Sequence, residues 1–134
     1  MKILFIGSVK FSFFMLEELI KMQTNIVGVC TLNKSNFNAD HYDLSKLSTA
    51  NQIDFIYAPE INKSENVNWI KNKSPDIIFC FGWSKLLSKE ILKIPEKGVI
   101  GFHPTLLPMN RGRHPLIWPL VLGLKETGSS FFFF

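Results

Sequence analysis

The segment Asp76-Ile77-Ile78-Phe79-Cys80-Phe81 gives the strongest strand signal in this chain of 134 residues. From Ile77 onward the segment is continuously apolar and rich in β-branched and aromatic side chains, which favour strands. Ser74-Pro75 precedes it and Gly82 follows it, and such residues mark the limits of regular structure. The segment therefore predicts a buried strand that ends at Gly82.

Strands and helices alternate on both sides of this segment, and the connections between them are short. Besides residues 76–81, strands are expected at residues 2–7, 25–32, 53–58 and 99–102, and helices at residues 13–23, 44–51, 64–70, 86–95 and 116–124. Ser64 is expected to cap the third helix, and Trp118 on the last helix is expected to be a core residue. This alternation predicts an α/β fold with a doubly wound, mostly parallel sheet and right-handed crossovers. Residues 1–134 are expected to lie in one domain.

The composition is that of a folded domain, with 46% hydrophobic and 19% charged residues. The net charge of +4 comes from scattered lysines rather than from a dense basic stripe, which disfavours nucleic acid as the main partner. No stretch reaches the length of a membrane span, and Lys10 interrupts the apolar start of the chain before any cleavage site. Cys30 and Cys80 each lie in an apolar run. We expect both to be buried free thiols of a cytoplasmic protein, with metal ligation as the alternative.

The predicted topology also indicates where a ligand would bind. In doubly wound sheets, ligands bind beyond the carboxyl ends of the strands. Three loops are expected at that edge, formed by residues 7–11, 82–87 and 103–113. Gly7-Ser8 lacks the further glycines of a dinucleotide-binding fingerprint, and the sequence has no phosphate-binding lysine loop. Oxidoreduction with a nucleotide cofactor is therefore disfavoured.

His103 is the candidate for proton transfer at this edge. It stands at the carboxyl end of a predicted strand and begins a loop that contains Pro104 and Pro108. Imidazole exchanges a proton more readily near neutral pH than other side chains do. The alternative is a histidine that only forms a hydrogen bond beneath the loop.

The stretch Gly101–Trp118 resembles the signature of the formyltransferase family, Asn-x-His-x-Ser-Leu-Leu-Pro-x-x-Arg-Gly-x-x-Pro. Thr105 replaces the serine, and the matching positions are Leu106, Leu107, Pro108, Arg111, Gly112 and Pro115. Weaker similarity extends over almost the whole chain. The resemblance implies a Rossmann-like fold and transfer of a formyl group from N10-formyltetrahydrofolate to an amine, with no metal.

Within that family, Arg111-Gly112-Arg113-His114-Pro115 is most similar to enzymes that formylate amino sugars on nucleotides. The implied partners are folate and a nucleotide-linked amino sugar, as in O-antigen or lipopolysaccharide biosynthesis. Two alternatives stay open. One is methionyl-tRNA formyltransferase or another family member, and the other is a folate- or nucleotide-binding module without catalysis.

The resemblance assigns His103 as the catalytic residue. The expected folate-binding residues are Gly82, Trp83, Leu86, Leu87, Pro104, Leu106, Leu107 and Pro108. The expected substrate-binding residues are Gly7, Ser8, Lys10, Arg111, Gly112, Arg113 and His114. The alternatives are core packing for Trp83 and a solvated side chain for Lys10 and for each arginine.

Two features depart from the family pattern. Gly101 occupies the position of an asparagine that helps to stabilise the oxyanion. The family also continues beyond Gly128 to an aspartate that orients the histidine, and none of the 11 acidic residues takes that place. We therefore expect an incomplete amino-terminal part of the catalytic domain, with little or no transfer activity. The four phenylalanines at 131–134 indicate a shifted reading frame at a homopolymer run, with deliberate truncation as the alternative.

Residues 129–134 are expected to form a strand whose apolar side chains need cover. An exposed apolar edge strand favours pairing with a second chain. The sequence therefore predicts a homo-oligomer that forms through this strand.

Overall fold

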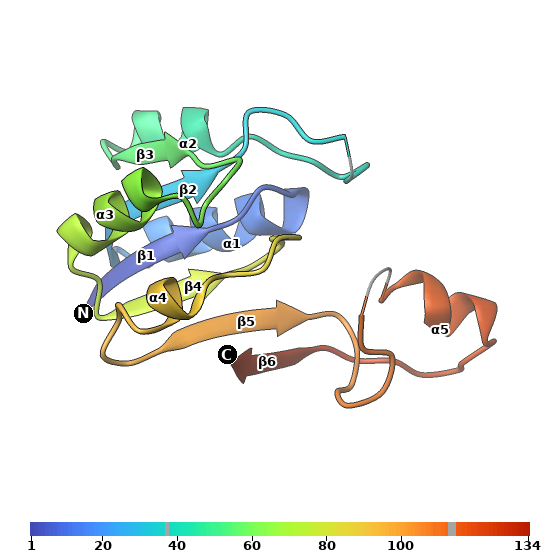
Figure 1. Ribbon diagram of the computed structural model, residues 1–134. Coiled ribbons are helices and arrows are strands. Elements are labelled where there is room, and N and C mark those ends of the chain that lie inside the picture. Colours follow the sequence, from blue (N-terminus) through green and yellow to red (C-terminus); the bar gives the residue numbers. More distant parts are fainter. Residues whose placement is uncertain (37, 113–114) are drawn as a thin grey trace.

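The computed structural model describes residues 1–36, 38–112 and 115–134, and these residues form a six-stranded sheet with helices on both faces (Figure 1). The strands are β1 (Lys2–Ile6), β2 (Asn25–Thr31), β3 (Phe55–Tyr57), β4 (Ile77–Cys80), β5 (Val99–His103) and β6 (Ser130–Phe133). The helices are α1 (Lys10–Lys21), α2 (Ser45–Ala50), α3 (Ser64–Lys73), α4 (Lys89–Leu92) and α5 (Ile117–Val121). The spatial order of the strands is β3-β2-β1-β4-β5-β6.

The sheet confirms the predicted doubly wound topology. Strands β1 to β5 pair in parallel, and β6 pairs antiparallel with β5. After β1 the chain adds β2 and β3 on one side, and it then returns to add β4 and β5 on the other side. The direction of winding therefore reverses between β1 and β4, and their carboxyl ends form the topological switch point where such folds bind ligands.

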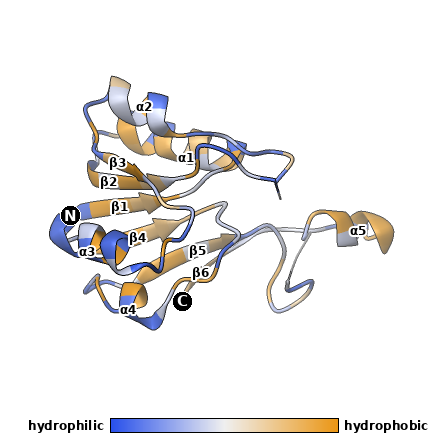
Figure 2. Cartoon of the chain, turned by 45° about the horizontal axis from the view of Figure 1, so that its top comes forward, coloured by the Kyte–Doolittle hydropathy of each residue, from blue (hydrophilic) through white to orange (hydrophobic). Residues whose placement is uncertain are grey.

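The core consists of one apolar layer on each face of the sheet. Because successive strand residues point to opposite faces, Leu4 and Ile6 of β1 pack with α3 and α4, whereas Phe5 packs with α1 and α2. All three side chains are fully buried. Figure 2 shows hydrophobic residues along the central strands. A strand that is apolar at every position is therefore required at the centre of this sheet.

Some boundaries differ from the sequence-based expectations. Ser64 is the first residue of α3 rather than its cap, because Lys63 takes the N-cap position and no side chain caps that end. The helix expected from residue 86 begins only at Lys89, where the side chain of Ser88 accepts a hydrogen bond from the Ile91 amide. Leu86 therefore lies in a loop and is 88% exposed.

The expected strand at 53–58 and the expected helix at 116–124 are both shorter than predicted, as β3 and α5. Pro119 lies in the first turn of α5, where its missing amide proton breaks no helical hydrogen bond. The prediction that Trp118 is a core residue was wrong, since half of its surface is exposed.

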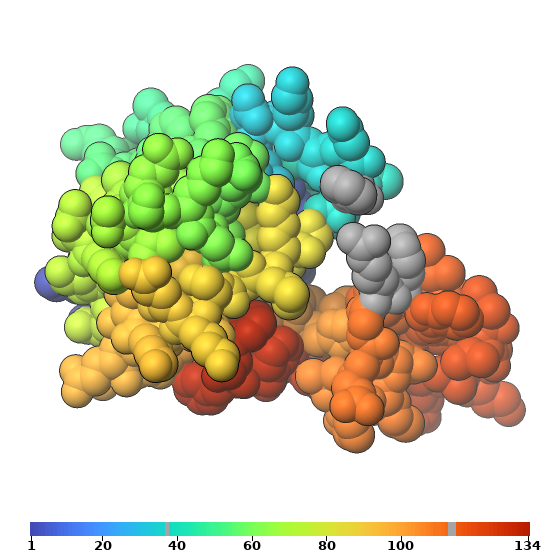
Figure 3. Space-filling model, in the orientation of Figure 1, coloured from blue at the N-terminus to red at the C-terminus, as the bar shows by residue number. Residues whose placement is uncertain are grey.

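The segment between β5 and β6 extends beyond the edge of the sheet and contains α5 (Figures 1 and 3). Its helix is apolar (Figure 2), and the side chains of Leu116, Leu120 and Val121 are each more than 60% exposed. None of the helices in the described part of the chain is long and apolar enough to cross a membrane.

Strand β6 is held against β5 by aromatic contacts on both faces. On one face, the rings of Phe132 and Phe134 lie over Gly101, where an added Cβ would come within 2.7 Å of each ring. On the opposite face, Phe131 packs against Phe81 and Phe102 with ring centroids 5.6 and 5.1 Å apart. A side chain at position 101 is therefore excluded unless the two rings move.

We predict that Gly101→Ala lowers the free energy of unfolding by about 1–3 kcal/mol, the usual cost of overpacking. Chemical denaturation measures this change. The matched control carries Phe132→Leu and Phe134→Leu, which replace both rings with smaller side chains. The alanine should cost at least 1 kcal/mol less in that background, because residues in contact are energetically coupled. Equal costs in the two backgrounds would show that the rings do not restrict position 101.

Candidate active site

A cavity of about 570 Å³ lies at the carboxyl edge of the sheet, at the switch point between β1 and β4. Its walls come from the loops that follow β1, β2, β4 and β5, and from β6. The lining residues are Val9, Phe11, Asn38, Asp40, Cys80, Gly82, Trp83, Ser84, Lys85, Leu86, Phe102, His103, Pro104, Gly112, Pro115, Leu116, Phe132 and Phe134. This volume lies within the range of small-molecule sites, and apolar side chains dominate the lining.

The loop after β4 is fixed at its start by close packing against α1. Gly82 has a φ of +68°, and a Cβ there would collide with Val9 and with the Ser12 hydroxyl. Ser12 Oγ donates to the carbonyl of Phe81 at 2.5 Å and accepts from the Val9 amide at 3.2 Å. Only glycine satisfies both the left-handed backbone and the close approach.

The far end of the same loop is held by Asn62. Its Nδ2 donates to the Leu86 carbonyl at 2.9 Å, and its Oδ1 accepts from the Ser88 amide at 2.8 Å. Lys85 Nζ donates to the carbonyl of Pro59. These bonds attach the loop after β4 to the loop after β3, so the cavity wall is anchored at both ends.

His103 is the last residue of β5 and is partly buried in the cavity wall. Its Nε2 lies 3.0 Å from the main-chain carbonyl oxygen of Asn110. Because a carbonyl oxygen only accepts, Nε2 carries the proton in this bond. In the neutral ring, Nδ1 then holds the free lone pair.

The loop after His103 is closed by two hydroxyl groups. Thr105, which is fully buried, donates from Oγ1 to the Met109 carbonyl at 3.0 Å. Ser130 of β6 donates to the Thr105 carbonyl at 2.8 Å and accepts from the Leu107 amide at 3.1 Å. The loop also contains a cis peptide bond between Leu107 and Pro108. Strand β6 thus fixes the loop that carries His103.

The polar groups of the cavity are few. Asp40 is the only carboxylate in the described lining, and the Lys10 amide donates to its main-chain carbonyl at 2.9 Å. Trp83 packs against the core, yet its indole Nε1 is buried and has no hydrogen-bond partner among the described residues. Burial raises the pKa of the Cys80 thiol to about 12, so it is protonated and a poor nucleophile at neutral pH. Burial also raises the pKa of Cys30.

The cavity brings together only part of the predicted site. The predicted residues that line it are Gly82, Trp83, Leu86, His103, Pro104 and Gly112. The predicted residues that lie outside its lining are Leu87, Leu106, Leu107, Pro108, Gly7, Ser8, Lys10 and Arg111. Ser8 is fully buried, whereas Lys10 and Arg111 are exposed. Arg113 and His114 fall outside the described residues.

Sequence reasoning missed several lining residues, including Asn38, Asp40, Phe132 and Phe134. Two signals were available for them. The loop with Asn38 and Asp40 follows β2, whose carboxyl end lies at the same edge as those of β1 and β4. Phe132 and Phe134 alternate along a predicted strand, which places them on one face.

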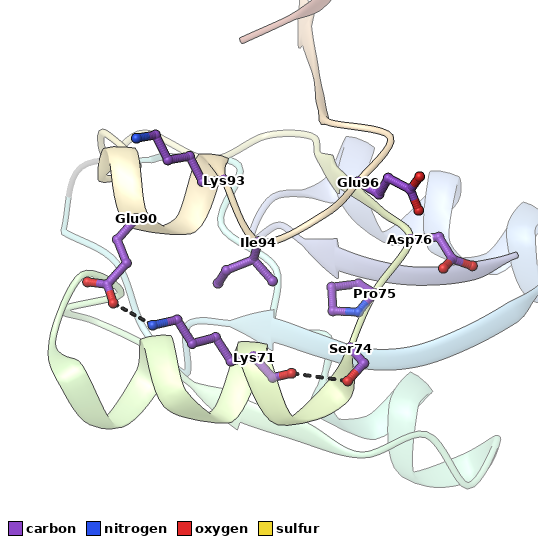
Figure 4. A pocket seen from close by; sticks show the side chains of 8 residues that line it. All are labelled: Lys71, Ser74, Pro75, Asp76, Glu90, Lys93, Ile94 and Glu96. Carbon is purple, nitrogen blue, oxygen red and sulfur yellow. Dashed lines mark hydrogen bonds and ion pairs between the residues drawn. The ribbon is translucent and has the colours of Figure 1, made fainter.

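A second cavity of about 540 Å³ lies at the opposite edge of the sheet (Figure 4). Lys71 and Glu90 form an ion pair at 2.6 Å in its wall, and Ser74 donates to the Lys71 carbonyl at 3.3 Å. Its described lining contains no histidine or cysteine. The cavity at the carboxyl edge is therefore the better candidate for proton-transfer chemistry.

Several known proteins are similar in sequence to this chain. The family model described as formyl transferase matches residues 1–134. Methionyl-tRNA formyltransferase of Thermotoga sp. (strain RQ2) is 31% identical over 132 residues, which cover 96% of this chain and 42% of that protein. The bifunctional polymyxin resistance protein ArnA of Wigglesworthia glossinidia brevipalpis is 33% identical over 130 residues, covering 96% of this chain and 20% of that protein.

The fold is also that of solved formyltransferases. A phosphoribosylglycinamide formyltransferase from Bacillus halodurans superimposes with a TM-score of 0.79 at 18% identity, covering 99% of this chain and 71% of that chain. This chain thus spans less than half the length of the methionyl-tRNA formyltransferase that it matches. The match of the family model over residues 1–134 shows that the chain belongs to the formyltransferase family.

Proposed function

We propose that the cavity at the carboxyl edge binds N10-formyltetrahydrofolate and that the formyl group passes to the amine of a nucleotide-linked amino sugar. The observation that carries this proposal is His103, whose ring lies in the wall of a largely apolar cavity and is fixed by the Asn110 carbonyl. The ring can exchange a proton with a ligand beside a surface suited to a flat heterocycle.

The lining supports a heterocyclic donor. Trp83, Phe102 and Phe132 provide aromatic surface, which favours stacking with flat ligands. The buried Nε1 of Trp83 lacks a protein partner in the described chain, and a carbonyl or ring nitrogen of the donor would satisfy it. Leu86, which is largely exposed, would be covered by the bound ligand.

The donor supplies the formyl carbon, and a side chain of the protein must transfer one proton from the attacking amine to the leaving nitrogen. An attacking amine becomes positively charged as it adds to the formyl carbon and must lose a proton before the product is neutral. Nδ1 of His103, left free by the bond to Asn110, would accept that proton and pass it to the leaving nitrogen. Such proton transfer typically contributes about 10²- to 10⁴-fold in rate.

The acceptor would approach from the side of Asp40 and Gly112. Asp40 is exposed and would attract an amine that is protonated in solution. That amine would release one proton to solvent before it attacks the formyl carbon. Arg111 is exposed next to Gly112 and would pair with a phosphate of the nucleotide. The sugar nucleotide itself is supported by the similarity of residues 111–115 to amino-sugar formyltransferases.

A second candidate function is formyl transfer to methionyl-tRNA, favoured by the similarity to the Thermotoga methionyl-tRNA formyltransferase. The modest net charge of +4 gives such a polyanion little attraction. A third candidate is binding without turnover, favoured by the absence of a side-chain donor at Gly101. Parallel assays with nucleotide-linked amino sugars and with methionyl-tRNA separate the first two, and donor binding without transfer to either acceptor indicates the third.

The proposed reaction also requires a cellular compartment. We propose the cytoplasm, and the two free buried thiols support a reducing environment.

For an active form that carries the rest of the family's catalytic domain, we predict that His103→Asn lowers kcat for formyl transfer by about 10²- to 10⁴-fold and leaves the dissociation constant for the donor within about twofold. The reason is that the ring acts on the reacting atoms rather than on the heterocycle. Single-turnover kinetics and calorimetry measure the two quantities.

The matched control is His41→Asn. His41 also bonds a main-chain carbonyl through Nε2, at 2.9 Å from Leu32, but it does not line the cavity. Its replacement should leave kcat unchanged. If His103→Asn kept its turnover at saturation and lost donor binding, His103 would be a structural residue.

We also propose that the chain forms a homo-oligomer through β6. This strand is the last in the sheet order, and Phe131 and Phe133 are 58% and 66% exposed. An edge strand with exposed aromatic side chains is a template for pairing with a second copy.

Light scattering should give a mass above that of one chain, and Phe133→Ser should lower it to the monomer value. The matched control is Phe14→Ser on α1, a position that is 50% exposed and whose ring contact is with Phe13 rather than with β6. A monomer mass for the unmodified chain at high concentration would contradict this proposal.

A further inference from the structure

Asn110 has an unusual backbone conformation directly beneath the proposed proton-transfer group. Its φ is +52°, and the only other described residues that combine a side chain with a positive φ are Gln23, Gln52 and Ser74. Asparagine is one of the few residues with a side chain that adopts this left-handed conformation at low cost.

The conformation determines where two successive carbonyl groups point. The carbonyl of Met109 accepts from Thr105 Oγ1, and the carbonyl of Asn110 accepts from His103 Nε2, each at 3.0 Å. Both donors lie on the short segment that leaves β5. The turn at Asn110 thus directs two consecutive acceptors toward the same side, and one of them holds the imidazole ring.

We propose that Asn110 is a positioning residue for His103, and that it acts through its main-chain carbonyl rather than through its side-chain amide. The carbonyl fixes the proton on Nε2 and leaves Nδ1 as the basic atom. Among the described residues, the Asn110 carbonyl is the hydrogen-bond partner of the ring. The inference builds on the proposed role of His103 in proton transfer.

This proposal makes the side chain at 110 important only for its backbone preference. Glycine lacks the amide but adopts a positive φ freely. Isoleucine also lacks the amide but is β-branched, and a positive φ is strongly unfavourable for it. For alanine, the cost of a positive φ lies between those of glycine and isoleucine. The order of the variants therefore separates a conformational role from a chemical role of the asparagine amide.

The experiment is nuclear magnetic resonance of the ¹⁵N-labelled full chain without ligand. A ring N–H proton that is open to water exchanges too fast to be seen, whereas one held in a hydrogen bond gives a signal. We expect a signal from His103 Nε2–H in the unmodified chain and in Asn110→Gly, and loss of that signal in Asn110→Ile. The His103→Asn variant assigns the signal by its absence.

Turnover of an active form that carries the rest of the family's catalytic domain provides the second measurement. Asn110→Ile should lower kcat by about tenfold to 100-fold with little change in KM for the donor, because a displaced ring fails in the reaction rather than in binding. Asn110→Gly should keep kcat within about twofold of the unmodified chain. If the isoleucine variant does not fold, Asn110→Ala replaces it and should weaken the ring signal relative to glycine.

Two results would overturn the proposal. One is loss of the ring signal in Asn110→Gly, which would assign the contact to the amide. The other is the absence of a protected ring signal in the unmodified chain. The ring signal does not depend on formyl transfer. A protected ring in a chain whose His103→Asn variant keeps full turnover would therefore remove the proposed function and leave the hydrogen bond established.

Discussion

The parallel pairing of β1 with β4 is the constraint on which the candidate site depends. These two strands are buried at the centre of the sheet, and the chain reverses its direction of winding between them. The helices that follow them lead to opposite sides of the sheet, and the cavity lies at their carboxyl ends. The Ser8 amide donates to the Gly82 carbonyl at 3.3 Å and joins the two strand ends. Every loop of the cavity is placed relative to this junction.

Hydrogen bonds from side chains hold the loops of the cavity wall in place. Asn62 attaches the loop after β4 to its neighbour through two hydrogen bonds, and Ser130 attaches the loop after β5 to β6 through two more. Catalytic groups need such support, because small displacements of a reacting group reduce the rate strongly. Asn62 and Ser130 are distant in sequence from the loops that they hold, so the site forms only when the whole sheet is assembled.

The aromatic end of the chain shapes the same site. Phe132 and Phe134 occupy the space over Gly101, the position at which the family pattern has an asparagine. The cavity is therefore more apolar at this point than the family signature implies. The same packing of Phe132 and Phe134 over Gly101 excludes a side-chain donor at this position and adds aromatic surface.

Much of the fold was predictable from the sequence, because apolar runs and short connections determine a parallel sheet locally. The central strand at 76–81 and the cavity position of His103 follow from such patterns. Other features depend on contacts between distant segments. The start of the helix at Lys89 depends on the hydrogen bond that the Ser88 side chain accepts from the Ile91 amide. The exposure of Trp118 depends on where the segment between β5 and β6 lies.

Within the site, the bond between His103 and Asn110 could not be predicted, because it is made by a main-chain carbonyl whose direction depends on one backbone angle. The side chain of Asn110 gives only a weak indication of that angle. The alternating phenylalanines of β6 were predictable as one face of a strand, but their contact with Gly101 required the antiparallel register with β5.

We propose above all that the cavity at the carboxyl edge of β1 and β4 is the donor site. Titration of the ¹⁵N-labelled chain with 5-formyltetrahydrofolate, a stable analogue of the donor, tests it most directly. We predict saturable chemical-shift changes centred on residues 82–86 and 102–104 and on the Trp83 indole N–H. Changes centred on Lys71, Asp76 and Glu90 at the opposite edge, or no saturable change at all, would contradict it.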